Sequence, residues 1–248
     1  MEDFHAKHSV NFRDNKKPIP YFVLENVKGL LSHDSGRTFA IIYRVLTDIG
    51  YTVECQLLNT RWVLPQNRER IYIVGYIGRG SKSKVFPITE NDKVIKKQSR
   101  KKDRKSTSMQ NGYSRTINSR IHKMGCEDTY IKVKEATKKG YAEARIGDSI
   151  NLSVPNSKTR RGRVGKGEAQ TLDTGMQQYT IDKTAIRRLT PVECMRLQGF
   201  PDDWNEKGII DGKEVNMSDT QRYKQAGNAV SVPIVSMVAE RIKNAKQK

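Results

Sequence analysis

Two short stretches decide the fold, Phe22-Val23-Leu24-Glu25-Asn26-Val27 and, about forty residues later, Pro65-Gln66-Asn67-Arg68-Glu69-Arg70. The first is an apolar run that delivers a carboxylate at its end, a pattern typical of an interior parallel strand. The second places two arginines at the start of another apolar run, 71–76. Ligands bind at strand ends in α/β sheets, so an acid and two guanidinium groups there predict a planar, hydrogen-bonding substrate such as a nucleobase beside a phosphate.

The elements around these stretches predict an α/β sheet. Residues 38–49 carry apolar side chains at helical spacing (Phe39, Ile42, Val45, Leu46 and Ile49), and Gly50 follows as a C-terminal stop. Residues 51–59 and 70–76 are expected to be strands. This strand–helix–strand–strand order supplies about half of a doubly wound sheet, so we expect an open edge and an uncovered apolar face.

The charge of the chain favours a polyanionic partner. Its 46 Lys and Arg residues against 27 Asp and Glu give a net charge of +19, which promotes phosphate contacts and counterion release. The alternative is a basic protein without a specific partner. The N-terminus is not a basic-then-apolar signal and no apolar run approaches membrane-spanning length, so we expect a soluble, cytoplasmic protein.

The middle of the chain changes character. Eight of the thirteen residues 93–105 are Lys or Arg, and residues 93–112 are expected to form a mobile loop unless a polyanion orders them; a solvated linker is the alternative. Residues 129–183 alternate in short pieces between glycines and prolines, which predicts a small loop-rich β region. Its basic run 158–167 suits contact with a groove or phosphates, but its glycine spacing excludes a phosphate-binding P-loop.

Helical signals return near the C-terminus. Thr190-Pro191-Val192-Glu193 is an N-cap followed by Pro at the first helical position and an acid in the first turn. Cys194 and Leu197 are expected to face the core, and Trp204, in an aromatic turn, is also expected to be buried. Residues 218–244 predict a helix interrupted at Gly227-Asn228.

Four motifs together resemble the cytosine-C5 DNA methyltransferase family and occur in its order. They are Glu25-Asn26-Val27, Gln66-x-Arg68-x-Arg70, Arg188-Leu189-Thr190-Pro191-x-Glu193-x-x-Arg196-Leu197-Gln198-Gly199-Phe200-Pro201, and Gln225-x-Gly227-Asn228-Ala229-Val230-x-Val232-Pro233. The resemblance covers roughly residues 20–245. It implies three parts: the second half of a catalytic α/β domain (1–78), a target-recognition region (79–187) and a helical return to the catalytic domain (188–248).

The resemblance also implies the chemistry. In that family the target cytosine is flipped out of the duplex, a cysteine thiolate attacks C6, and C5 receives a methyl group from S-adenosyl-L-methionine. Glu25 would then hydrogen-bond the N3 and amino edge of the base, Arg70 would reach its O2, and Arg68 would brace Glu25 or a phosphate. Without the other motifs, Glu25 would be interpreted as a capping or ion-pairing acid at a strand end.

Further binding residues follow from the same match. Asn228, Ala229 and Val230 correspond to a segment that completes the cofactor pocket. Thr171-Leu172 matches a pair at the core of the recognition domain, which reads base edges in the major groove of double-stranded DNA. The residues expected to contact DNA are Lys96, Lys97, Lys101, Lys102, Arg160, Arg161, Arg163, Lys166 and Thr171.

The sequence departs from the family pattern upstream of Glu25, where the Phe-x-Gly-x-Gly cofactor loop and the Pro-Cys nucleophile of a complete enzyme do not occur. Cys55 and Cys194 are expected to be packing residues, and Cys126 to be an exposed thiol without activating neighbours, so we assign no nucleophile; the cysteine spacing also predicts no metal site. We therefore expect a methyltransferase component that needs a complementing polypeptide. The alternatives are a catalytically inactive DNA-binding module and a gene remnant.

Overall fold

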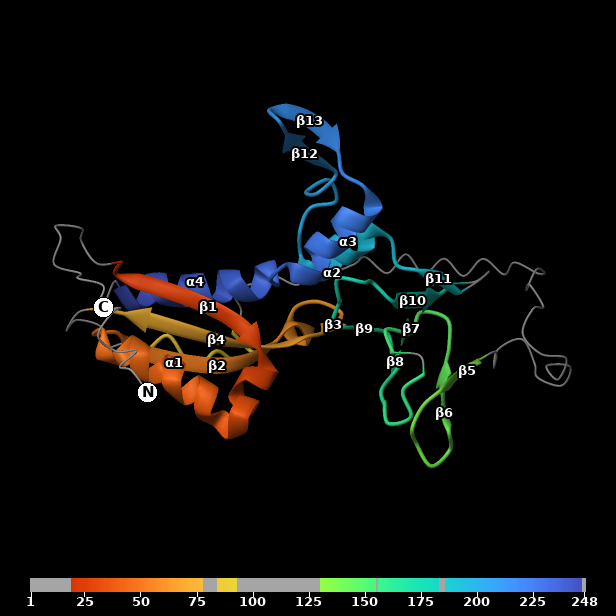
Figure 1. Cartoon of the computed structure of the whole chain (residues 1–248), viewed down its shortest axis with the longest axis horizontal. Helices are drawn as coiled ribbons and strands as arrows, with labels where there is room; N and C mark the ends of the chain where they lie inside the picture. Colours follow the sequence, from red (N-terminus) through yellow and green to blue (C-terminus); the bar gives the residue numbers. More distant parts are fainter. Residues whose placement is uncertain (1–18, 78–83, 93–129, 155, 183–185, 247–248) are drawn as a thin grey trace, which may run out of the picture. The chain divides into compact units, whose positions relative to one another are not determined.

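The computed structural model describes residues 19–77, 84–92, 130–154, 156–182 and 186–246 (Figure 1). The chain forms two compact units. Unit 1 comprises Met1–Leu58, Arg70–Ile88 and Glu240–Lys248, and unit 2 comprises Asn59–Glu69 and Thr89–Ala239. The three-part division expected from the sequence stays a prediction, because these units group residues 188–239 with the recognition region. No helix in the described ranges is both long and apolar enough to cross a membrane.

Unit 1 is built on a three-stranded sheet in the order β1 (Tyr21–Val27), β4 (Glu69–Tyr76), β2 (Thr52–Asn59). The chain passes from β1 through two short 3-10 turns, η1 (Lys28–Leu31) and η2 (His33–Gly36), into helix α1 (Arg37–Asp48) and then β2. Its core is formed by side chains from both sheet and helix: Tyr51, Val53, Ile71 and Ile73, with Phe22, Leu30, Phe39, Leu46 and Ile77 packed against them. The predicted strand–helix–strand–strand order is confirmed.

The expected interior parallel strand is wrong. Strand β1 pairs antiparallel with β4, with Tyr21 opposite Tyr76 and Val27 opposite Arg70, and it lies at the edge of the sheet. The side chains of Val23, Leu24 and Val27 are 40–51% exposed. An open edge with uncovered apolar side chains was expected, and this strand has both.

Helix α1 has apolar side chains on two faces. Phe39 and Leu46 pack into the core of unit 1. Ile41, Val45 and Ile49 lie at spacings of four residues and are exposed. A helix that is apolar on both sides is normally buried on both.

The β part of unit 2 is small and rich in loops, as the sequence predicts. A four-stranded sheet has the order β11 (Ile186–Arg188), β10 (Gln178–Ile181), β7 (Ser149–Asn151), β8 (Val164–Gly165). A hairpin of β5 (Ile131–Lys134) and β6 (Tyr141–Ala144) accompanies it, and β9 (Ala169–Gln170) pairs in parallel with β3 (Gln66–Asn67), which follows η3 (Thr60–Trp62).

The helical part of unit 2 begins with α2 (Pro191–Gln198), whose start is a capping box. Thr190 Oγ1 accepts from the Glu193 N–H, and Glu193 in turn accepts from the Thr190 N–H. Gly199 ends the helix with a φ of +84°, a conformation that favours glycine. The buried residues around it are Leu172, Met176, Leu189, Cys194, Met195 and Ala226.

The last elements are the hairpin β12 (Lys207–Ile210) and β13 (Lys213–Asn216), then α3 (Asp219–Asn228) and α4 (Val232–Lys246). The predicted helix break is confirmed, since α3 ends at Asn228 and α4 begins four residues later. The expectation that Trp204 is buried is wrong, because this side chain is 63% exposed beside Phe200.

Candidate functional site

The acid and one of the two arginines singled out by the sequence meet on the sheet of unit 1. In the antiparallel register Val27 lies opposite Arg70 and Glu25 opposite Tyr72, so Glu25 and Arg70 are diagonal neighbours on the same face. Arg70 Nε lies 3.1 Å from Glu25 Oε1, and their side chains are 13% and 22% exposed. The attraction between these charges is stronger than at a fully solvated surface, so the pair holds the carboxylate in place.

Arg68 is buried in unit 2 and organises main-chain groups. Its side chain is only 3% exposed, and its Nη2 donates to the Ala229 carbonyl at 2.7 Å. Its own backbone N–H donates to Asn59 Oδ1, and its carbonyl accepts from the Thr60 N–H. Arg68 therefore fixes the loop after α3 to the loop before β3. Bracing of Glu25 or a phosphate by Arg68 stays a prediction.

The segment that the resemblance assigns to the cofactor is held in a defined position. A Cβ at Gly227 would lie 2.7 Å from the Asp173 carbonyl carbon and oxygen, so only glycine fits there without a main-chain shift. The Ala229 carbonyl is held by Arg68, whereas Asn228 is exposed and Val230 is half-buried. The Asn228 carboxamide and the Val230 side chain thus remain accessible to a ligand.

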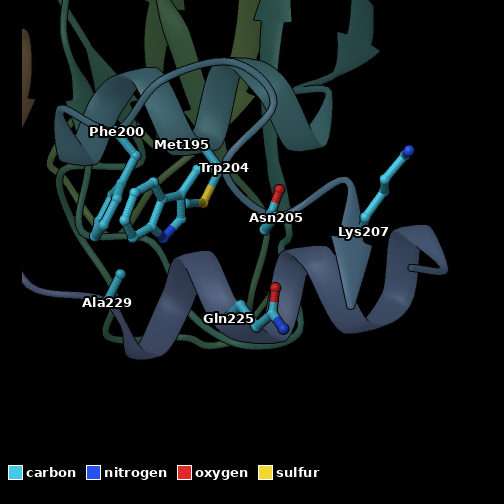
Figure 2. A pocket seen from close by; sticks show the side chains of 7 residues that line it. All are labelled: Met195, Phe200, Trp204, Asn205, Lys207, Gln225 and Ala229. Atoms are coloured by element: carbon cyan, nitrogen blue, oxygen red, sulfur yellow. The ribbon is translucent and has the colours of Figure 1, made fainter. Parts of the chain in front are cut away.

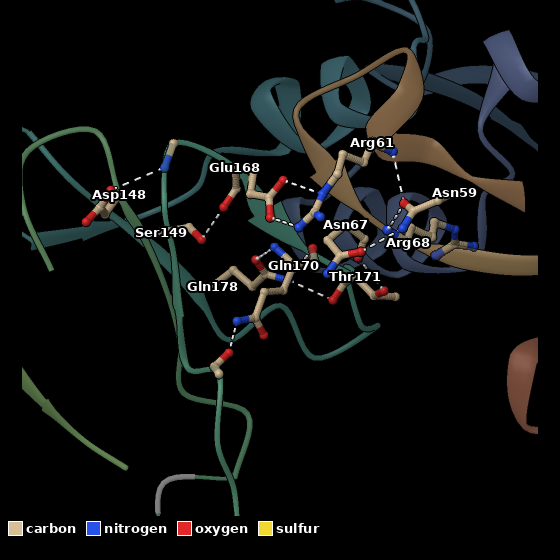
Figure 3. A network of polar contacts seen from close by, with 12 residues as sticks. Asn59, Arg61, Asn67, Arg68, Asp148, Ser149, Glu168, Gln170, Thr171 and Gln178 are labelled. Carbon is tan, nitrogen blue, oxygen red and sulfur yellow. Dashed lines mark hydrogen bonds and ion pairs between the residues drawn. The ribbon is translucent and has the colours of Figure 1, made fainter. Parts of the chain in front are cut away.

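A polar network connects residues 148–178 to residues 59–68 (Figure 3). Arg61 binds both carboxylate oxygens of Glu168, one of them at 2.8 Å from Nε. Thr171 Oγ1 donates to the Asn67 carbonyl, and the buried Gln178 carboxamide donates to the Gln170 and Thr171 carbonyls. The Thr171 hydroxyl thus supports this junction within unit 2.

Sequence reasoning missed Asn59, Arg61 and Glu168. The one local signal was Asn59 before a short turn, where its side chain accepts from the Arg61 N–H. The pairing of Arg61 with Glu168 spans 107 residues, and no local pattern indicates it.

The arginines and lysines expected to contact DNA differ in accessibility. Arg163 is 2% exposed and donates to the Val154 and Ser157 carbonyls; its assignment as a DNA contact is wrong, because these carbonyls hold its guanidinium inside the loop. Arg161 and Lys166 are exposed and Arg160 is half-buried. Lys166 also pairs with Asp148 at 2.9 Å. Lys96, Lys97, Lys101 and Lys102 lie outside the described residues.

Neither described cysteine has the environment of a nucleophile. Burial raises the pKa of the Cys194 thiol to about 12, and its Sγ lies 3.5 Å from Met176 Sδ, which confirms a packing role. Cys55 is exposed rather than packed, so that expectation is wrong, yet partial desolvation raises its pKa as well. A reactive thiol needs a lowered pKa. Cys126 lies outside the described residues.

Comparison with known proteins decides the family. The sequence profile of the C-5 cytosine-specific DNA methylase family matches residues 9–244. The chain belongs to this family. Among curated members of the family, the chain is 35% identical over 240 residues to the Type II methyltransferase M.SsoII of Shigella sonnei, and 31% identical over 237 residues to M.Bsp6I of Bacillus sp. (strain RFL6).

The chain spans about half to two thirds of the length of these relatives. The alignments cover 92% of this chain but 53% of M.SsoII and 66% of M.Bsp6I. Among solved structures, the Entamoeba histolytica methyltransferase EhMeth aligns with a TM-score of 0.48 and 18% identity, covering 95% of this chain and 67% of EhMeth.

Proposed function

We propose that this chain is the base-recognising component of a DNA (cytosine-5-)-methyltransferase, which transfers a methyl group from S-adenosyl-L-methionine to C5 of a cytosine flipped out of double-stranded DNA. The observation that carries the proposal is the Glu25–Arg70 pair, in which two residues from separate family motifs lie 3.1 Å apart on one face of the sheet. Family membership supplies the reaction type.

The roles of the two side chains follow from the edge of cytosine. Its exocyclic amino group is a donor, which a carboxylate such as Glu25 accepts, and protonation at N3 is favoured by the same negative charge. Arg70 presents a fixed fork of donors and suits the O2 acceptor of the base. The ion pair keeps the Glu25 carboxylate oriented before the base binds, so this group needs little reorganisation during the reaction.

S-adenosyl-L-methionine supplies the methyl group when bound. Of this chain's residues, Asn228, Ala229 and Val230 would form part of its pocket. They fit that role because Gly227 and Arg68 hold the main chain on either side while the Asn228 side chain stays accessible.

The remaining groups are proposed to come from a complementing polypeptide that carries the cofactor loop and the Pro-Cys nucleophile. The raised pKa of the Cys194 thiol supports this, because a thiol protonated at neutral pH cannot attack C6. The exposed apolar side chains of β1 and α1 support it as well, since contiguous apolar surface marks an interaction site. The relatives' designation as Type II methyltransferases supports a role in restriction-modification.

DNA binding is proposed to be electrostatic and centred on residues 93–105 and 158–166. If about six phosphates are neutralised, log K against log salt should have a slope near −5. Replacing Lys96, Lys97, Lys101 and Lys102 by Gln should flatten this slope. An unchanged slope and affinity would show that these lysines do not contact DNA.

The test of the proposed function is Glu25→Gln in the enzyme assembled with its complementing polypeptide. The substitution keeps the size of the side chain but removes its negative charge, so the rate of methyl transfer should fall by about 10²–10⁴-fold. DNA affinity, measured in parallel, should change much less, because phosphate contacts dominate binding. The matched control, Lys101→Gln, should weaken DNA binding and spare the chemical step. Methyl transfer by the Glu25→Gln enzyme within about threefold of the unaltered enzyme, against the loss expected for an acid–base group, would show that Glu25 is a structural acid.

A catalytically inactive DNA-binding module is the second candidate, favoured by the unreactive Cys194. The two are separated by DNA that carries 5-fluorocytosine at the target site. The chain alone should form no denaturant-stable adduct under either proposal, and the assembled enzyme should form one only if it is a methyltransferase. An adduct with the chain alone would show that one of its own cysteines is the nucleophile.

A further inference from the structure

A cavity of about 200 Å³ opens in unit 2 between α2, the turn that follows it, and α3 (Figure 2). The buried Met195 lies on its inner side, and Phe200 and Trp204 form an aromatic wall. The two rings lie 5.5 Å apart at an interplanar angle of 40°. Although Trp204 lines the cavity, 63% of its surface is exposed, so a large aromatic face is available to a ligand.

The position of Trp204 is fixed by the turn that carries it. The Trp204 N–H donates to the Pro201 carbonyl at 3.3 Å. Arg196 of α2 forms an ion pair with both carboxylate oxygens of Asp202, one of them at 2.6 Å from Nε. The indole is thus presented by an ordered backbone, which lowers the entropy cost of binding against it.

The charged groups at the rim are already paired. Lys207 lines the cavity with its stem, but its Nζ lies 2.7 Å from Glu214 Oε1 and points away (Figure 2). Asn205 exchanges two hydrogen bonds with Arg222, at 3.1 and 3.2 Å. The cavity therefore offers little net charge to a ligand, which disfavours an anionic group such as a phosphate.

Two polar groups of the cavity remain available. Within the described residues, neither the Gln225 carboxamide nor the indole N–H of Trp204 forms a hydrogen bond to the protein. Gln225 projects from α3 beside the cavity (Figure 2). A carboxamide pairs with the donors and acceptors at the edge of a base, as in bidentate recognition of adenine, and an aromatic face stacks on a base of any kind.

We propose that this pocket binds the base of an unpaired nucleotide in DNA, stacked on Trp204 with its edge toward Gln225. The size of the pocket supports a single ring system, because it lies below the roughly 300–1,000 Å³ typical of sites for larger ligands. The excess of basic residues, +19 overall, brings the sugar-phosphate backbone to the protein, and the neutral pocket takes the uncharged part of one nucleotide. The residues that line the pocket belong to unit 2 and include Ala229 of the proposed cofactor segment, whereas Glu25 belongs to unit 1.

The test uses two single-stranded oligodeoxynucleotides of equal length, one with bases and one with abasic residues at every position. Both carry the same phosphates, so only the first can stack. In the full chain with Trp62→Phe, Trp204 is the one remaining tryptophan and its fluorescence reports on the pocket. We expect the base-bearing strand to quench this fluorescence and the abasic strand to leave it unchanged.

Affinities measured by anisotropy of the labelled strands complete the test. Trp204→Ala should weaken binding of the base-bearing strand by about 5- to 150-fold and leave the abasic strand unaffected. Trp204→Phe, which keeps an aromatic face, should retain part of the affinity. Gln225→Ala should weaken only the base-bearing strand, by a smaller factor.

The outcomes separate this inference from the proposed function. Equal binding of both strands by the unaltered chain and by Trp204→Ala, without quenching, would overturn the base pocket and leave DNA binding intact. If neither strand binds, DNA binding is contradicted. In that case, quenching of Trp204 fluorescence by free thymidine or deoxyadenosine would still support a base pocket. If these nucleosides do not quench the fluorescence, the base pocket is overturned, and an aromatic side chain of a protein partner is the next occupant to test.

Discussion

The two units of this chain are stabilised differently. Among the described residues, all eleven buried polar or charged side chains, including Gln66, Arg68, Arg163, Gln178 and Gln198, lie in unit 2, and none lies in unit 1. Unit 1 instead contains nine of the fifteen exposed large hydrophobic side chains. Unit 2 buries polar side chains and links some of them by hydrogen bonds, such as those from the Gln178 carboxamide to the Gln170 and Thr171 carbonyls, whereas unit 1 leaves apolar side chains exposed. The difference teaches that polar contacts inside the unit distinguish unit 2, and exposed apolar side chains distinguish unit 1.

The substitution Arg163→Met tests this difference between the two units, and it has the largest expected effect on stability. The buried guanidinium donates to two carbonyls of the loop at 154–157, and removing it leaves them without that partner. Because a hydrogen bond from a charged donor contributes about 1.5–3 kcal/mol, we expect the free energy of unfolding to fall by about 3 kcal/mol. Urea unfolding of the full chain measures it. The control is the exposed Arg161→Met, which removes one solvent-accessible hydrogen bond to the Ala136 carbonyl and is expected to cost about 1 kcal/mol; equal losses would show that burial of Arg163 is not what stabilises the loop.

A smaller effect is expected from Glu193→Gln, and it depends on pH. The Arg187 guanidinium and the helix cap lower the pKa of the Glu193 carboxyl to about 2, below its unfolded value of roughly 4.3. The folded state therefore favours the carboxylate, and the stabilisation is complete above the unfolded pKa and is lost as pH falls through the folded one. At pH 7 the substitution should cost about 1 kcal/mol, as for other cap losses.

Thermal unfolding of both proteins between pH 7 and pH 2.5 measures this effect. The difference between them should shrink as the pH falls. Glu214→Gln, which removes an exposed pair with Lys207, should change stability by less than about 1 kcal/mol at every pH. A Glu193→Gln difference that stays constant down to pH 2.5 would contradict the assigned pKa.

The smallest effect on stability is expected on the outer face of α1. Ile41→Glu with Val45→Lys replaces two exposed apolar side chains by an oppositely charged pair one turn apart. Stability should change by less than about 0.5 kcal/mol, while binding to the proposed complementing polypeptide should weaken. Sedimentation velocity measures the association. Leu46→Ala, on the inner face, should instead lower stability by about 2 kcal/mol or more, and association that the outer-face change leaves unaltered would show that this face is not an interface.

Local signals in the sequence predicted the local structure well. Thr190 and Glu193 form the cap that their spacing indicates, Gly199 ends the helix, and Gly227-Asn228 marks the break between α3 and α4. These features depend on backbone groups within a few residues, which a short sequence window contains.

Features set by pairing across the chain were not predictable in the same way. Glu25 and Arg70 were found from their motifs, but their diagonal contact depends on an antiparallel register between β1 and β4, whereas a parallel strand was expected. The sequence of the basic run at 158–167 does not indicate which of its arginines are exposed, as Arg161 is, and which are buried, as Arg163 is. The inward choice depends on carbonyls at 154 and 157, which every sequence supplies.

The hydrogen bond from Arg68 to the carbonyl of Ala229, 161 residues away in the chain, has a consequence for how this family evolves. Every amino acid carries a main-chain carbonyl, so a substitution at residue 229 leaves the acceptor of this hydrogen bond in place. This bond therefore imposes no covariation between positions 68 and 229, and statistical coupling between the two positions would overlook a contact that joins two distant motifs. The bond is lost when Arg68 is substituted, whereas a substitution of Ala229 keeps the accepting carbonyl.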